Sequence, residues 1–193
     1  MTASAVSICS NALLMLGDNP INSFDDPGDR ARLASNLWAP ARDYVLRSHP
    51  WNCAVKQVVL SPDTEAPPFG FAYQFTLPGD WLRTLCVGEP GERPDFKIRS
   101  GKLHMHSNVC MLEYVFRNDN PATWDTMLVW AMTVAMRSIF AYGISQSASL
   151  EQVIDQALRE VLRRARAADG QEETNEALDD NPLRDARFIG WSR

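Results

Sequence analysis

The stretch RDYVLRSHPWNCAVKQVVL, from Arg42 to Leu60, decides the fold because its pattern changes from helix to strand within a few residues. A proline restricts the residue before it to an extended backbone, so Pro50 requires the helix to end at about Ser48. Trp51 is large enough to cover the end of that helix. The apolar run that follows, AVKQVVL, has the composition of a β-strand. We therefore predict a fixed joint at Pro50 and Trp51 between a helical part and a β part.

Helical patterns lie on both sides of this joint. Apolar residues recur at helical spacing from Ser4, an expected N-cap, to Gly17, and again from Asp29, also an expected cap, to about Ser48. Residues 124–142 are apolar on most faces of a helix, and another amphipathic stripe begins after Ser149. A helix as apolar as 124–142 must be covered on several sides, by its own core or by a neighbouring subunit.

The segment between these helices has the alternating pattern of short strands. FAYQFTL, WLRTLCVG, DFKIRSGKLHMHS and VCMLEYVFR alternate apolar and polar residues and are separated by proline and glycine. RSGKL, within the third, is an expected hairpin turn. Because the strands are short and sequential, we expect a small antiparallel sheet or a barrel-like platform.

The predicted fold class is α+β. We expect a four-helix bundle, made of two N-terminal and two C-terminal helices, with an inserted small antiparallel β-sheet platform and an extended C-terminal tail. The bundle would comprise residues 1–53 and 118–180, the platform residues 54–117, and the tail residues 181–193.

Composition and charge exclude several classes of protein. The chain has 193 residues, 45% of them hydrophobic and 22% charged, which is typical of a globular protein with a proper core. Its longest apolar stretch is too short to span a bilayer, and no basic residue precedes the apolar N-terminus, so we expect no membrane association and no signal peptide. Its four well-separated cysteines suit reduced, buried thiols. The net charge of −5 argues against tightly bound nucleic acid, although DNA could slide past an acidic wall.

Two groups of residues could carry chemistry, and both have a simpler interpretation. His104 and His106 would share one face of a strand near Cys110, which could form a zinc site, but no fourth ligand is suggested. His49 and Cys53 could form a base and thiol pair, but no oxyanion motif accompanies them. The chain also lacks a glycine-rich phosphate loop. We therefore expect no enzymatic activity, no cofactor and no metal.

The C-terminal region has a charge pattern typical of an interaction surface. A basic cluster, expected to face the acidic surface of a neighbouring subunit, consists of Arg159, Arg163, Arg164 and Arg166. The alternative is a solvated helix face with i to i+4 pairs. The tail is too short to fold alone, yet it is rich in aromatic, aliphatic and arginine residues, so we interpret it as a docking segment rather than one that folds back on its own subunit. Its docking residues would be Leu183, Arg184, Arg187, Phe188, Ile189, Trp191 and Arg193.

A family resemblance covers nearly the whole chain. The run ICSNALLMLGDNPINSFDDPGDRARLASNLWAPARDYVLRSHPWNCAVKQVVL has a first helix ending in Leu-Gly, an Ile-x-Ser-x-x-Asp loop, a second helix, and an Arg/His-x-x-Trp joint before a strand ending in Leu. YQFTLPGDWLRTL, LEYVFR and the two C-terminal helical patterns follow in order. Together these elements resemble the tail tubular protein A family, the head-to-tail adaptors of short-tailed phages and related prophages.

The resemblance implies a structural role in a bacteriophage virion. Members of the family form a dodecameric ring beneath the portal, extend the DNA channel and offer a platform to the tail nozzle or next tail component. On this basis the expected partners are other copies of the chain, the portal protein, the next tail component and DNA passing without sequence-specific binding. The expected location is the head-tail junction of the virion, after synthesis in the bacterial host cytoplasm. The pair His104 and His106 and the arginine cluster depart from the general pattern of the family.

Two other functions remain open from the sequence. The chain could be a non-phage helical interaction module whose C-terminal helix binds the partner. It could also be a small metal-dependent or thiol enzyme that uses His104, His106 and Cys110.

Overall fold

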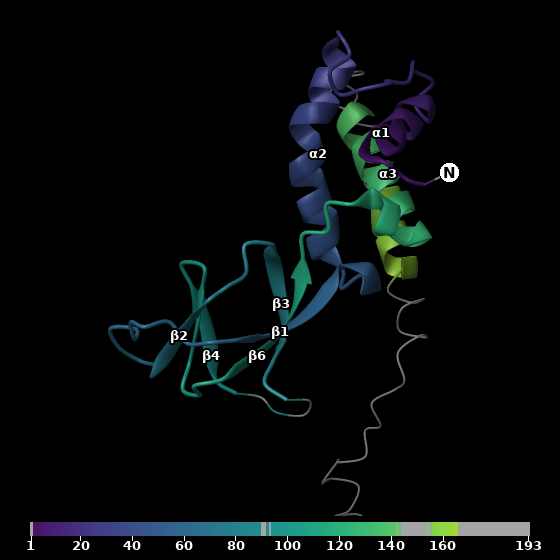
Figure 1. The fold of residues 1–193 in the computed structure, drawn as a ribbon. Coiled ribbons are helices and arrows are strands. Elements are labelled where there is room, and N and C mark those ends of the chain that lie inside the picture. The colour runs from purple at the N-terminus through teal and green to yellow at the C-terminus, as the bar shows by residue number, and fades with distance from the viewer. Residues whose placement is uncertain are drawn as a thin grey trace, which may run out of the picture.

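The protein has an α+β fold in which helices lie beside a β platform (Figure 1). The structure, a computed structural model, describes residues 2–89, 92, 94–141, 143, 154 and 156–165. The order of elements confirms the predicted class, because two helices precede the strands and helical residues follow them. The expected C-terminal tail, residues 181–193, and Ser149, the expected cap of the last helix, lie outside the described residues.

The two N-terminal helices lie within the predicted ranges, although α1 ends at Leu14 and not near Gly17. Helix α1 covers Ala5–Leu14, and Ser4 forms a capping box with Ser7. The backbone N–H of Ser7 donates to the Ser4 hydroxyl and the backbone N–H of Ser4 donates to the Ser7 hydroxyl, so both donors at the helix start are bonded. Helix α2 covers Asp29–Ser48 and ends where Pro50 requires. Asp29 is the first residue of α2 and not its cap as predicted, since Gly28 occupies that position with φ of 144°.

The platform contains two three-stranded antiparallel sheets. In sheet A the strand order is β1 (Val55–Leu60), β6 (Cys110–Phe116) and β3 (Trp81–Val87). In sheet B the order is β2 (Tyr73–Thr76), β5 (Lys102–Met105) and β4 (Phe96–Arg99). The expected hairpin turn is confirmed at Ser100 and Gly101, which both have positive φ between β4 and β5. The apolar sides of the two sheets share one cluster: Phe75, Leu77, Val87, Leu103, Met105, Cys110, Leu112 and Tyr114.

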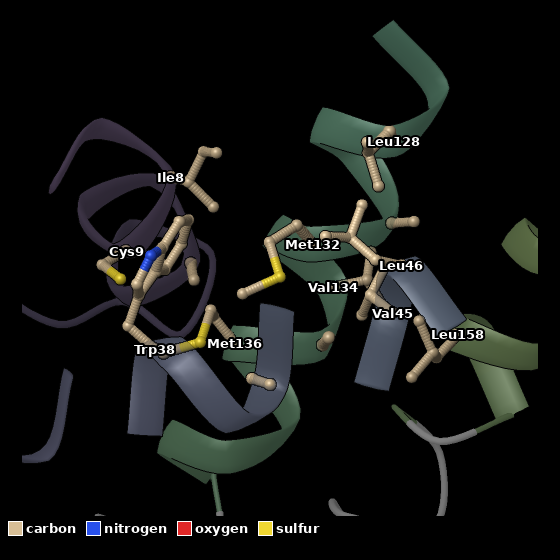
Figure 2. Packing of buried hydrophobic residues seen from close by; sticks show 14 of the residues in the cluster. Ile8, Cys9, Trp38, Val45, Leu46, Leu128, Met132, Val134, Met136 and Leu158 are labelled. Atoms are coloured by element: carbon tan, nitrogen blue, oxygen red, sulfur yellow. The ribbon is translucent and has the colours of Figure 1, made fainter. Parts of the chain in front are cut away.

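The helical core is centred on α3 (Thr126–Phe140), which is capped by Asp125. Both α1 and α2 pack on α3, which explains why its sequence is apolar on most faces. Trp38 of α2 and Trp124 stack with ring centroids 6.0 Å apart. Figure 2 shows side chains of α1, α2 and α3 gathered in this cluster with Leu158 of a further helical stretch, residues 156–165.

The predicted four-helix bundle is wrong. The helices of a bundle enclose a core of their own, whereas here α1, with ten residues, and α2, with twenty, both pack on α3. The core of the helices is also not closed within them. It continues through Ala54, directly before β1, into sheet A at Leu82 and Val115, and all three belong to the same buried cluster as the helices. The structure therefore has helices packed around α3 and joined to a two-sheet platform.

Candidate interaction surfaces

The joint between α2 and the platform is built around Trp51. This side chain is 1% exposed, and its indole Nε1 donates a hydrogen bond to the carbonyl oxygen of Val45 at 3.1 Å. That oxygen lies in the last turn of α2, where the carbonyls have no partner within the helix. The ring of His49 meets Trp51 edge to face, with centroids 4.8 Å apart. The predicted role of Trp51 in covering the helix end therefore has a direct geometric basis.

Polar contacts hold the same joint from its outer side. The Arg47 guanidinium of α2 donates to the carbonyl oxygen of Leu82 in β3 at 2.6 Å. Asp43 of α2 accepts a hydrogen bond from Arg117, directly after β6, at 3.0 Å. Asn118 donates to the carbonyl oxygen of Cys53 at 2.8 Å. The platform is thus attached to the helices by packing and by hydrogen bonds from several elements, which restricts bending at the joint.

The outer side of sheet A carries an exposed hollow with an acidic lining. Strand neighbours point to opposite sides of a sheet, so Val59 and Met111, which are paired across β1 and β6, face away from the shared platform core. Their side chains are 65% and 39% exposed. They line a hollow of about 970 Å³ together with the exposed Cys86. Its carboxylates, Glu89, Glu92 and Glu113, are met by no basic side chain among the described lining residues. We call this surface the acidic hollow.

The outer side of sheet B carries the opposite charge. Lys97 and His104 are paired across β4 and β5, and Arg99 and Lys102 are paired two residues further along. Asp63 forms an ion pair with Lys102 at 2.7 Å, and this lysine holds the pKa of the Asp63 carboxyl below its usual range. Lys97 lies 5.8 Å from the ring of Phe71. We call the surface formed by Phe71, Lys97, Arg99, Lys102, His104 and His106 the basic face.

A third surface is an apolar patch on the helices. Leu14 at the end of α1 and Trp130 on α3 are 55% and 48% exposed. With Met15 and Val129 they line a hollow of about 450 Å³. Large exposed apolar side chains grouped in this way are typical of a protein contact. The sequence pattern does not indicate this patch, although Trp130 falls on a helix expected to be covered on several sides.

The predicted arginine cluster is only partly described. Arg163 and Arg164 both form ion pairs with Glu160 of their own helical stretch, at 2.8 and 2.9 Å. These contacts are the i to i+3 and i to i+4 pairs of a solvated helix face, the alternative left open by the sequence. Arg159 and Arg163 nevertheless line a hollow of about 440 Å³ with Tyr44 and Arg47 of α2. Arg166 and the predicted docking tail, residues 181–193, lie outside the described residues.

The residues considered for metal binding are separated by burial. His104 and His106 lie against Phe71, with ring centroids 6.4 and 5.0 Å away. Cys110, in contrast, is fully buried in the cluster between the two sheets, and this burial raises the pKa of its thiol to about 11. Within the described part of the chain, no three His, Cys, Asp or Glu side chains are placed to hold a metal ion together. The structure therefore offers no support for the zinc hypothesis.

Cys53 is not placed as an activated nucleophile either. Its sulfur lies 3.5 Å from a carboxylate oxygen of Asp125, the N-cap of α3. Burial and then the charge of Asp125 raise the pKa of the Cys53 thiol to about 11, which keeps it protonated. The ring of His49 packs on Trp51, as described above. Cys53 thus contributes to the start of α3 as a weak donor.

Comparison with models of known protein families and with curated proteins finds no match to this chain. None of the helices in the described ranges has both the length and the apolar character needed to cross a bilayer.

Proposed function

We propose that this chain is a structural head-to-tail adaptor of a bacteriophage virion. It would form a ring, expected to be dodecameric, between the portal and the tail nozzle or next tail component, and it would extend the DNA channel. The observation that carries the proposal is the resemblance to the tail tubular protein A family. It rests on the order and spacing of motifs along nearly the whole chain, from the first helix through the joint at Trp51 to the last helical stripe.

The architecture of the joint is consistent with this role. A ring subunit that transmits DNA between two assemblies must hold its portal side and its tail side in a fixed relation. Here the apolar core of the helices continues into sheet A, and Arg47 and Arg117 bond across the same junction. Rigid attachment of this kind suits a structural platform better than a hinged enzyme domain.

The surfaces also suit assembly. The described residues present an acidic hollow, a basic face and an apolar helix patch, and each is an exposed surface of the kind that partner proteins cover. The net negative charge of the chain suits a channel wall along which DNA moves without binding. We assign portal docking to residues 181–193 and assign the protein to the head-tail junction after synthesis in the host cytoplasm.

The test is electron microscopy of the purified chain with and without the portal protein of the same virus. Adaptors can assemble only on their portal template, so the free chain need not form rings. The full chain should form rings on the portal, and a chain ending at Asp180 should lose them if the tail is the docking segment. If neither chain associates with the portal, the adaptor proposal is wrong and an interaction module of another kind becomes the better explanation.

A further inference from the structure

The two sheets present opposite charges on opposite sides of the platform. Their apolar sides face one another across a shared cluster that includes Phe75 and Leu103 of sheet B and Leu112 of sheet A. Because side chains alternate along a strand, the other side of each sheet must point away from that cluster. The outward-facing residues of the acidic hollow, such as Met111 and Glu113, and those of the basic face therefore belong to opposite sides of the platform, and Phe96 of β4 marks the edge at which the hollow reaches sheet B.

We propose that the basic face of one copy docks on the acidic hollow of the next copy, so that the platforms form a head-to-tail contact. This inference rests on the proposed ring, for which it names the contact between subunits. Two different surfaces that complement one another make a heterologous interface, and such an interface repeats until the rotation closes a ring. A self-complementary pair of identical surfaces would instead stop at a dimer.

Charge complementarity is the first reason to expect a second copy of the chain on the acidic hollow. Glu89, Glu92 and Glu113 line the hollow, whereas Lys97 and Arg99 are exposed on the basic face. In an isolated subunit these charges cost little, because water solvates them. When copies meet, opposite potentials favour the heterologous contact, and like charges oppose the contact of two identical faces. The charges thus select the head-to-tail orientation.

Apolar groups at the centre of both surfaces are the second argument. Val59 and Met111 line the acidic hollow and keep 65% and 39% of their surface exposed in the single chain. Phe71, half-buried on the basic face, contacts the rings of both histidines and lies near Lys97. An aromatic side chain that enters a hollow lined by aliphatic groups is a common centre of a protein interface, and the surrounding charges form its polar rim.

An exposed native thiol allows a direct test. Cys86 lines the acidic hollow, whereas Cys9 and Cys110 are buried. The variant Lys97→Cys would place a second thiol on the basic face. A short bismaleimide added to rings on the portal should then link Cys86 of one copy to residue 97 of the next, and gels should show a ladder of dimers, trimers and higher species. Adding Cys86→Ser to this variant should remove the ladder.

Charge reversal provides the second test. Lys97→Glu with Arg99→Glu, or Glu89→Lys with Glu113→Lys, should each lower the fraction of portals that carry a ring by roughly tenfold or more, because like charges then meet. All four substitutions together should restore rings, because opposite charges meet again. The matched control is Glu65→Lys, an exposed loop residue outside both surfaces, which should assemble normally.

The outcomes separate this inference from the adaptor proposal. Rings that form on the portal without a cross-link ladder, or that ignore both charge reversals, would overturn the platform contact and leave the adaptor proposal standing. If the reversal at Lys97 and Arg99 abolishes binding to DNA and leaves rings unchanged, the basic face serves nucleic acid and the inference is wrong. Absence of any ring with the unmodified chain would refute the adaptor proposal itself.

Discussion

Replacing Trp51 by alanine tests whether the joint is as rigid as its packing indicates. The side chain is 1% exposed. Truncation of a buried aromatic residue to alanine usually lowers the free energy of unfolding by about 3 to 5 kcal/mol. The lost hydrogen bond to Val45 should add only about 1 kcal/mol, because the hydroxyl of Ser48 also donates to that carbonyl at 2.7 Å. Since small domains have only about 5 to 15 kcal/mol of stability, Trp51→Ala should be severely destabilised.

The matched control is Trp51→Phe, which keeps an aromatic ring but has no indole N–H. We expect it to lose about 1 to 2 kcal/mol, well below the alanine variant, since the cavity is smaller and the carbonyl of Val45 keeps Ser48 as a donor. Urea unfolding monitored by circular dichroism gives both free energies. Hydrogen exchange in α2 and in β1 shows whether the two parts still unfold together. A loss below about 1 kcal/mol for Trp51→Ala, or equal losses for both variants, would refute this account of the joint.

Three further predictions concern the platform and the thiols. The ion pair with Lys102 lowers the pKa of Asp63 in the folded state, so the stability that this ion pair contributes is present above the ordinary aspartate pKa and is lost as the pH falls below about 4. In urea unfolding, Asp63→Asn should therefore show a flatter dependence of stability on pH in this range. An unchanged pH profile would contradict this role of Asp63. Gly88 has φ of 92°, and an added Cβ would lie 3.1 Å from a carboxylate oxygen of Glu92, so Gly88→Ala should lower the free energy of unfolding by about 1 to 3 kcal/mol in thermal or urea unfolding. The control Gly79→Ala, where an added Cβ meets open space, should be nearly neutral. Similar losses for both variants would show that the backbone at residue 88 does not require glycine. In the folded chain a maleimide should modify Cys86 first, because burial raises the pKa of the other three thiols to about 11 or 12. Mass spectrometry identifies the modified cysteine, and equally fast modification of another cysteine would contradict this order of reactivity.

The joint could be predicted from sequence because its causes are local. Pro50 limits the backbone of the residue before it, so the end of α2 at Ser48 follows from two neighbouring residues. Ser4 likewise starts α1 through contacts within its own first turn. The strands of the platform were recognisable from alternation, which is also a local property.

The predictions of a four-helix bundle and of a single sheet were wrong because the residues that pack together lie far apart in the sequence. An amphipathic pattern shows that a helix has a buried side, but it does not show whether another helix or a sheet covers that side. Here Leu82 and Val115 of sheet A complete the core of the helices. Pairing between strands is similarly distant, since β1 pairs with β6, which follows β3, β4 and β5 in the chain.

The candidate surfaces show the same division. The sequence identified the arginines near residue 163, but only the structure shows that Glu160 pairs with two of them. The alternating pattern places polar residues along the strands, but it does not show that Glu89, Glu92 and Glu113 line one hollow or that Lys97 and Arg99 share another surface. That arrangement depends on which strands pair and on which sides of the sheets enclose the core.

The sequence by itself determined the α+β class, the start of α1, the end of α2 and the place of the joint, because caps, proline and alternation act over a few residues. Only the tertiary structure decided that α3 is the centre of the helical core, that the platform has two sheets, and that opposite charges lie on its two sides. These features arise from contacts between residues far apart in the chain, such as Val59 with Met111 and Trp38 with Trp124. Such contacts depend on which buried surfaces fit together, and that fit is a property of the whole chain.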